Sequence, residues 1–116
     1  IFEVGRSGTR KMITLIKSGG VVALMIDQAV KGGQYFKFLG LPAKTSTAIA
    51  EISMKYDAML IPAYGIRTDN SDIKVTFDKP IELKSVSHIT KEMNLSLEKR
   101  IIEAPTQWYW PHRRWK

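Results

Sequence analysis

An acid and an amide stand directly after a short apolar run, and this is the first place in the sequence where chemistry is expected. The run from Val21 to Ile26 is β-branched at both ends and follows two glycines, which is typical of a strand buried on both faces. Asp27 and Gln28 follow it. Ligands of open α/β sheets collect outside the carboxyl ends of strands, so both are candidate site residues. The alternative is that Asp27 only caps the next turn.

A cation ends a second apolar run. Residues 58–67 are apolar through Ile61, contain Pro62, and finish at Arg67. Proline favours a strand end or a bulge. A helix between the two runs would make them parallel neighbours, so Asp27 and Arg67 are expected to face one cleft. A guanidinium there would bind a phosphate or carboxylate through paired hydrogen bonds.

A helix expected over residues 5–18 leads into the first apolar run. Its apolar positions recur at i, i+3 and i+4, and Gly19 and Gly20 end it. Arg6 lies at its start, where the helix dipole disfavours a cation. Arg6 is therefore expected to contact an anion or carboxylate, unless it is a solvated surface arginine.

A second helix is expected over residues 47–56, with Thr45 or Ser46 as its N-cap. Free backbone N–H groups and hydroxyls at its start, with Lys44 beside them, form a candidate anion site. The preceding loop is rich in glycine and aromatic residues, and residues 34–39 alternate like an edge strand or hairpin arm. This loop is interpreted either as one wall of a pocket for an apolar chain or as a lid on the core.

The remaining chain is expected to form a hairpin, a sheet edge and a third helix. Residues 69–72 form the turn of a hairpin whose second strand covers residues 73–77, and residues 80–83 extend the edge. The third helix covers residues 90–104, is capped by its first threonine, and stops before Pro105. The sequence thus predicts an α/β fold with a mixed, partly parallel sheet flanked by helices.

The composition indicates one globular domain. The 116 residues are 44% hydrophobic and 25% charged. No apolar run approaches the roughly 18 residues of a membrane-spanning helix. Cysteine is absent and only two histidines are present, which excludes disulfides and thiolate metal sites and argues against structural zinc. The chain begins at Ile1, a few residues before a helical pattern, which favours a fragment of a longer protein.

The formal charge of +7 is unevenly distributed. Residues 1–44 carry seven Lys or Arg and two acids, residues 45–98 carry six and eight, and residues 99–116 carry five and one. Basic ends suit an anionic partner, so a nucleic-acid-binding or membrane-surface module without catalysis is one interpretation. No helix-turn-helix or RNA-binding aromatic pattern is present, and the acidic middle interrupts a basic stripe. We therefore expect no nucleic acid among the partners.

The carboxyl-terminal tail mixes aromatic residues with cations, and two interpretations of it remain open. Indole and phenol rings next to Arg113 and Arg114 would suit the surface of an anionic bilayer. Alternatively the tail folds back, buries its tryptophans in the core and turns both arginines toward the site.

Several segments, taken in order, resemble one family. They are Arg6 ahead of a helix, VVALMIDQ, FLGLPAKT, AMLIPAYGIR and EAPTQWYWPHRRWK. Over nearly its whole length the chain resembles the carboxyl-terminal part of the lipid A biosynthesis acyltransferases, the lauroyl and myristoyl transferases of Gram-negative bacteria. The resemblance implies that residues 1–116 are the carboxyl-terminal portion of a single domain of the glycerolipid-acyltransferase type, truncated at its amino terminus.

The resemblance also implies an activity and a place. A fatty acyl group would pass from the thioester of acyl-carrier protein to a hydroxyl of a lipid A precursor, with no other cofactor and no metal. The protein would work at the cytoplasmic face of the bacterial inner membrane, peripherally in this part. Asp27 and Gln28 would support catalysis. Substrate would be bound by Arg6, Thr45, Arg67, Arg113 and Arg114.

The catalytic motif of such enzymes is not found in the chain. The resemblance implies a histidine followed, after four spacer residues, by an acid that together deprotonate the acceptor hydroxyl. His88 is followed by Glu92, one residue too close, and no acid follows His112. The His-acid pair is therefore expected upstream, and the chain by itself is expected to be inactive.

Overall fold

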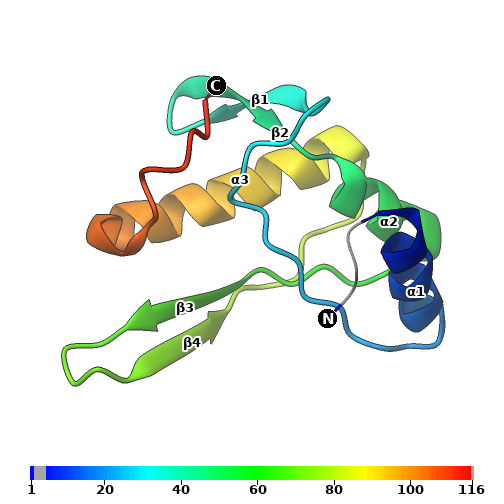
Figure 1. Cartoon of the computed structure of the whole chain (residues 1–116), viewed down its shortest axis with the longest axis horizontal. Coiled ribbons are helices and arrows are strands. Elements are labelled where there is room, and N and C mark those ends of the chain that lie inside the picture. Colours follow the sequence, from blue (N-terminus) through cyan, green and yellow to red (C-terminus); the bar gives the residue numbers. More distant parts are fainter. Residues whose placement is uncertain (2–4, 116) are drawn as a thin grey trace.

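The computed structural model describes Ile1 and residues 5–115 and confirms a mixed α/β class. A long helix, α3 (Val86–Glu103), crosses the molecule, and the other elements pack around it (Figure 1). In chain order these are α1 (Arg6–Lys17), β1 (Gln34–Phe38), β2 (Leu41–Thr45), α2 (Ala48–Tyr56), β3 (Ala63–Arg67), β4 (Ile73–Phe77), and the short 3-10 helix η1 (Pro105–Gln107) after α3. No helix within the described residues is long and apolar enough to cross a membrane.

The apolar stripe of α3 forms the centre of the core. Ile89, Met93, Leu97 and Ile101 recur every four residues and are all buried. The amino-terminal half of the stripe packs with Ala50 of α2. The carboxyl-terminal half packs with the β1–β2 hairpin, in the cluster Phe38, Ala43, Leu97 and Ile101. One helix face thus joins two separate parts of the chain.

The start of α3 differs from the prediction. The N-cap is Ser85, whose Oγ accepts a hydrogen bond from the backbone N–H of His88 at 3.1 Å. Thr90 lies inside the helix, and its Oγ1 donates to the carbonyl of Val86 at 2.7 Å. A serine with extended backbone three residues before a free N–H makes the better cap, so the helix begins one turn early.

Both sheets are antiparallel and two-stranded. β1 pairs with β2, and β3 pairs with β4 as the predicted hairpin. The turn between β1 and β2 places Leu39 and Gly40 at φ values of 47° and 85°, the left-handed region that two-residue hairpin turns require. The backbone N–H of Leu39 donates to Glu98 of α3 at 2.9 Å, which offsets part of the strain of a non-glycine residue there.

The predicted parallel pairing of residues 21–26 with residues 58–67 is wrong within the described chain. Residues 21–26 form neither a strand nor a helix. Val21 and Met25 are 92% and 85% exposed, and Ile26 alone of this segment packs against both core clusters. A strand needs neighbours for its backbone groups, and among the described residues β3 is paired only with β4. The prediction of a buried strand over residues 21–26 is therefore also wrong for the described residues.

The other boundaries lie close to the predicted ones, with three corrections. β3 starts at Ala63, just after Pro62, because proline cannot donate to a ladder. Thr45 does not cap α2. It ends β2 and is buried. The N-cap is Thr47, which makes no side-chain cap hydrogen bond, so Ser46 is not the cap either, although its Oγ accepts from the N–H of Ala48 at 3.3 Å. Residues 80–83 form no strand.

Candidate functional site

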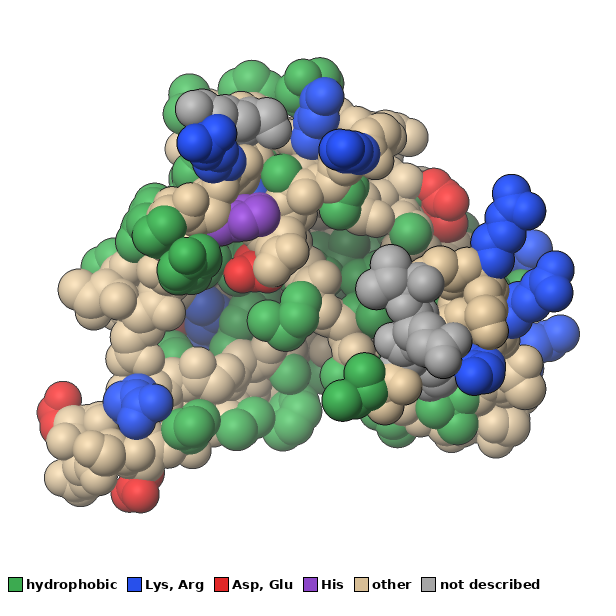
Figure 2. All heavy atoms as spheres, in the orientation of Figure 1, with side chains coloured by type: hydrophobic (Ala, Val, Ile, Leu, Met, Phe, Trp, Pro, Cys, Tyr) green, Lys and Arg blue, Asp and Glu red, His purple; other side chains and the backbone are tan. Residues whose placement is uncertain are grey.

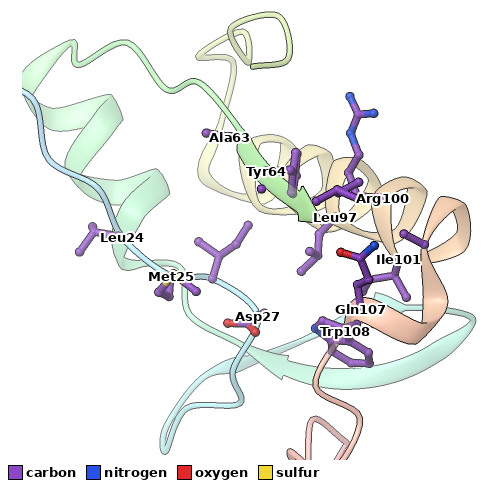
Figure 3. A pocket seen from close by; sticks show the side chains of 14 residues that line it. Leu24, Met25, Asp27, Ala63, Tyr64, Leu97, Arg100, Ile101, Gln107 and Trp108 are labelled. Atoms are coloured by element: carbon purple, nitrogen blue, oxygen red, sulfur yellow. The ribbon is translucent and has the colours of Figure 1, made fainter. Parts of the chain in front are cut away.

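A cavity of about 310 Å³ lies between residues 24–27, at the end of the segment that forms no strand, and β3 (Figure 3). α3 forms its floor, and η1 with the following tryptophan closes one end. Its lining residues are Leu24, Met25, Ile26, Asp27, Ala63, Tyr64, Gly65, Ile66, Leu97, Arg100, Ile101, Ala104, Gln107 and Trp108.

Sequence patterns explain why these elements meet there. Leu97 and Ile101 project from the same face of α3 because they are one turn apart. Ile26 and Tyr64 pack on the cluster that contains them, which fixes the segment and β3 on the same helix. The segment and β3 do not pair, so space is left between them. The walls of this space are therefore mainly apolar.

One end of the cavity is polar, and Figure 3 shows the side chains of Asp27 and Trp108 together there. Within the described part of the chain, Asp27 Oδ1 and Trp108 Nε1 are buried without a hydrogen-bond partner. Both residues line the cavity. Arg100 Nε is unpaired as well, but the Arg100 side chain points away from this end (Figure 3). Buried polar atoms in folded proteins normally have partners, because an unpaired one costs about 1 to 3 kcal/mol. An acceptor and a donor are thus free to bind polar groups of a ligand with an apolar body.

A hydrogen-bonded chain holds β3 and β4 to α3 beside the cavity. Tyr64 Oη and Ser96 Oγ lie 2.7 Å apart, and Ser96 Oγ donates to Asp78 Oδ2 at 2.8 Å, so Tyr64 donates to Ser96. Arg100 pairs with Asp78 and, at 2.9 Å, with Glu103. Its guanidinium lies 5.5 Å from the centre of the Tyr64 ring. The position of Tyr64 in the cavity wall is thereby fixed.

Burial and charge shift two pKa values in this network. Burial raises the pKa of Tyr64 above its ordinary value, and the Asp78 carboxylate adds to the increase. Burial alone would raise the pKa of Asp78, but hydrogen bonds from Ser96 and Arg100 outweigh it and hold that pKa below its ordinary value. Tyr64 is therefore a neutral donor at pH 7 and Asp78 an anion.

The tail folds back on the β1–β2 hairpin. Arg114 is fully buried, and donates from Nη1 to the carbonyl of Lys44 at 2.6 Å and from Nη2 to Thr45 Oγ1 at 2.8 Å. Its guanidinium lies 4.7 Å from the centre of the Phe38 ring. Burial lowers the pKa of Arg114, and the nearby Asp27 carboxylate opposes this shift. The arginine thus connects the tail, the hairpin and the polar end of the cavity.

Further contacts fix the tail in the same place. Trp108 and Trp115 pack on Phe38 with ring centres 5.8 Å and 5.7 Å away. Nε2 of His112 accepts a hydrogen bond from the backbone N–H of Ala29 at 3.0 Å, so the tail also holds the loop after Asp27. Of the two interpretations of the tail, the folded-back one is confirmed for these tryptophans. Trp110 is 48% exposed.

The cavity contains only one of the predicted site residues, Asp27. Gln28 is exposed and does not line it, and Arg6 is exposed at the start of α1. Thr45 is buried, with its hydroxyl oxygen bonded to Arg114, and Arg113 is exposed.

The expectation that Asp27 and Arg67 face one cleft is wrong for the described residues. Arg67 lines a neighbouring hollow at the end of β3, which shares Gly65 and Gln107 with the cavity but does not contain Asp27. The side-chain amide of Gln107 makes two hydrogen bonds with the backbone of Arg67. Its Oε1 accepts from the Arg67 N–H at 2.7 Å, and its Nε2 donates to the Arg67 carbonyl at 2.9 Å. The prediction required two adjacent parallel strands, and these are not formed.

Sequence reasoning missed Tyr64, Arg100 and Gln107 as cavity residues. A signal existed for Arg100, which stands three residues after Leu97 and directly before Ile101, a charged position inside an apolar stripe. Tyr64 and Gln107 gave no comparable signal, because their roles depend on contacts with distant parts of the chain.

Comparison with protein families gives one match. Residues 4–116 match the family model described as bacterial lipid A biosynthesis acyltransferase. The matched region is the carboxyl-terminal part of the family domain. No curated protein matches the chain significantly.

Proposed function

The chain belongs to the bacterial lipid A biosynthesis acyltransferases, and from this premise we propose that it forms the apolar substrate-binding part of an acyl-transfer site. In this proposal a fatty acyl group moves from the thioester of acyl-carrier protein to a hydroxyl of a lipid A precursor. The family match gives no support to the alternative of a nucleic-acid or membrane-surface module without catalysis.

The observation that carries the proposal is the cavity itself. Its walls are mainly apolar, which suits a hydrocarbon chain, and its polar end contains the unpaired oxygen of Asp27 and the unpaired N–H of Trp108. An ester-forming reaction needs a polar end of this kind, because the acceptor hydroxyl and the acyl carbonyl must be held close together in the orientation for attack. Asp27 would accept from the hydroxyl or orient a cation, and Trp108 would donate to an oxygen.

The general base is proposed to come from the amino-terminal part of the family domain. Neither His88 nor His112 lines the cavity. His112 already uses Nε2 to accept from the N–H of Ala29, which removes that nitrogen as a proton acceptor. The chain therefore binds and positions substrate, and the missing proton transfer is typically worth about 10² to 10⁴ in rate.

The setting follows from the family in the same way. A lipid A pathway suggests association with a membrane, and we propose a peripheral position at the cytoplasmic face of the inner membrane. No group beyond the carrier thioester is needed by the proposed transfer.

The first test compares the chain alone with the chain joined to the amino-terminal part of the family domain. Transfer of radiolabelled acyl groups from acyl-carrier protein to a lipid A precursor is measured for both. We expect turnover from the joined domain and at least a hundredfold less from the chain alone, because the base is missing. Robust turnover by the chain alone would show that the catalytic groups are misplaced.

The second test fills the cavity. Ala63→Trp and Ala104→Trp, made in the joined domain, project rings into the cavity, whereas Ala48→Trp adds the same ring at an exposed position of α2. We expect the first two to lower turnover of long acyl chains more than of short ones, and the third to leave both unchanged. Equal effects of all three variants on long and short chains would contradict the assignment of the cavity.

A further inference from the structure

The first helix carries an unusual charge distribution outside the cavity. α1 contains Arg6, Arg10, Lys11 and Lys17 and no acid. At 3.6 residues per turn, Arg6, Arg10 and Lys17 lie within about 40° of one another around the helix axis. They form a stripe about 16 Å long, at a rise of about 1.5 Å per residue.

A lysine of α2 extends this stripe. Nζ of Lys17 lies 5.7 Å from the centre of the Tyr56 ring, and Nζ of Lys55 lies 5.5 Å from it. One aromatic ring thus holds two ammonium groups from different helices near each other. Figure 2 shows Lys and Arg gathered on this side of the molecule. We define the α1–α2 cationic surface as Arg6, Arg10, Lys17 and Lys55.

Ion pairs do not neutralise this surface within the described part of the chain. The pairs found there join Lys84 to Glu82, and Arg100 to Asp78 and Glu103. Four like charges that form no salt bridge among the described residues repel one another, so an anionic partner would relieve the repulsion. The partner must therefore present negative charge over a length comparable to the stripe.

The packing of α1 distinguishes an acidic protein from a lipid bilayer. Helices that lie in a membrane surface bury a free apolar face among the lipids. The apolar side of α1 is already used, because Gly8 and Met12 are buried and Ile13 and Ile16 are half-buried. Leu15, at 37%, is its one exposed large apolar side chain. What remains outside is polar and cationic, which complements an acidic protein surface.

We infer that the α1–α2 cationic surface is the docking site for an acidic protein. Resting on the proposed function, we assign this partner as acyl-carrier protein bringing the thioester. The surface lies outside the cavity lining, so docking and acyl binding use different residues. Its contribution is mainly to the association rate and is sensitive to salt.

The test measures binding of the chain to fluorescently labelled acyl-carrier protein by anisotropy. Arg10→Glu with Lys17→Glu reverses two charges of the surface. Lys74→Glu with Lys91→Glu reverses two exposed charges on β4 and α3 and gives the same net charge. We expect the Kd to rise about tenfold for the first pair of substitutions and to stay unchanged for the control pair. At about 0.5 M salt, the difference in Kd between the two pairs should disappear.

Two further measurements make the outcome decisive. If charge reversal unfolds the chain, seen by circular dichroism, Arg10→Gln with Lys17→Gln replaces it, with a smaller loss of binding expected. Equal Kd values for surface and control variants overturn the inference. The inference is also overturned if the surface variants bind the carrier protein unchanged but lose binding to anionic vesicles. That result would identify a lipid surface as the partner instead.

Failure of the proposed function gives a different result. Acyl-pantetheine carries the thioester without the protein, so the joined domain should use it equally well with and without the surface variants. If the joined domain transfers from neither donor while carrier binding still depends on the surface, the docking inference stands and the acyl-transfer proposal fails.

Discussion

Arg114 illustrates how a buried cation can organise a polar site. Its two bonded nitrogens fix β2 at Lys44 and Thr45, its plane covers Phe38, and its charge lies near Asp27. A buried guanidinium is tolerated only when its donors are used and a counter-charge is close. Nη1 and Nη2 are bonded within the chain, whereas Nε is buried without a partner among the described residues. We therefore propose that Arg114 mainly positions the site.

Substitution of the two neighbouring arginines tests this assignment. Arg114→Ala removes the hydrogen bonds to Lys44 and Thr45 and leaves a cavity beside Phe38, so we expect a loss of about 2 to 4 kcal/mol in the free energy of unfolding. Arg113→Ala, at an exposed position, should change it by less than about 0.5 kcal/mol. Urea unfolding of both variants measures this. Equal midpoints would mean that Arg114 does not stabilise the tail.

The Asp78 carboxylate predicts a pH effect. Its pKa is lower in the folded chain than the ordinary value of 3.8, so between the two values the unfolded chain binds the proton and the folded chain does not. Its contribution is therefore fully present above about pH 5 and is lost as the pH falls through 3.8 and the folded pKa. Asp78→Asn should be less stable at pH 7 and should lose part of the wild-type decline in acid. Parallel stability curves for the two proteins would contradict this.

At the scale of elements, the β3–β4 hairpin is held in place by side-chain hydrogen bonds more than by apolar packing. Ile73, Val75 and Phe77 of β4 are exposed, so this strand contributes little to the core. The hairpin is instead tied to α3 through Tyr64, Ser96 and Asp78, and to η1 through Gln107. Elements held in this way open locally before the whole chain unfolds.

Gln107→Ala is expected to loosen the end of β3. The variant removes both hydrogen bonds to the backbone of Arg67, each worth about 0.5 to 1.5 kcal/mol. Amide hydrogen exchange in residues 63–67 should accelerate several-fold, while exchange in α3 stays the same. Gln34→Ala in β1, an exposed glutamine, serves as the control. Uniform acceleration throughout the chain would show that the hairpin and the core open together.

At the scale of the whole molecule, α3 is the element on which the fold depends. It contacts α2, β1 and η1, and its buried stripe contributes to both core clusters. A domain of this size is stable by only about 5 to 15 kcal/mol, so a single core truncation is a large fraction of the total.

Two leucines on α3 give a matched comparison. Leu97 is buried in the cluster with Phe38 and lines the cavity, whereas Leu95 is 55% exposed. Leu97→Ala should cost about 2 to 5 kcal/mol, and Leu95→Ala less than about 1 kcal/mol, because both keep the helix propensity and differ in burial. Thermal and urea unfolding check this. A similar loss in both variants would mean that the stripe is not the centre of the core.

The sequence by itself determined what depends on nearby residues. Helical periodicity and strand alternation are local patterns. They predicted α1, α2, α3 and β4 to within a few residues. The order of the family motifs can likewise be seen in the chain alone. Asp27 was found for the same reason, since an acid after an apolar run is visible in the chain.

Only the tertiary structure decided which side chains share a space. The burial of Arg114, the pairing of Gln107 with Arg67 and the network from Tyr64 to Arg100 all join residues far apart in sequence. The same holds for residues 21–26, whose apolar pattern predicted a buried strand that the described residues do not form. Pairing depends on where the rest of the chain places its backbone donors and acceptors, and a local pattern carries no information on that.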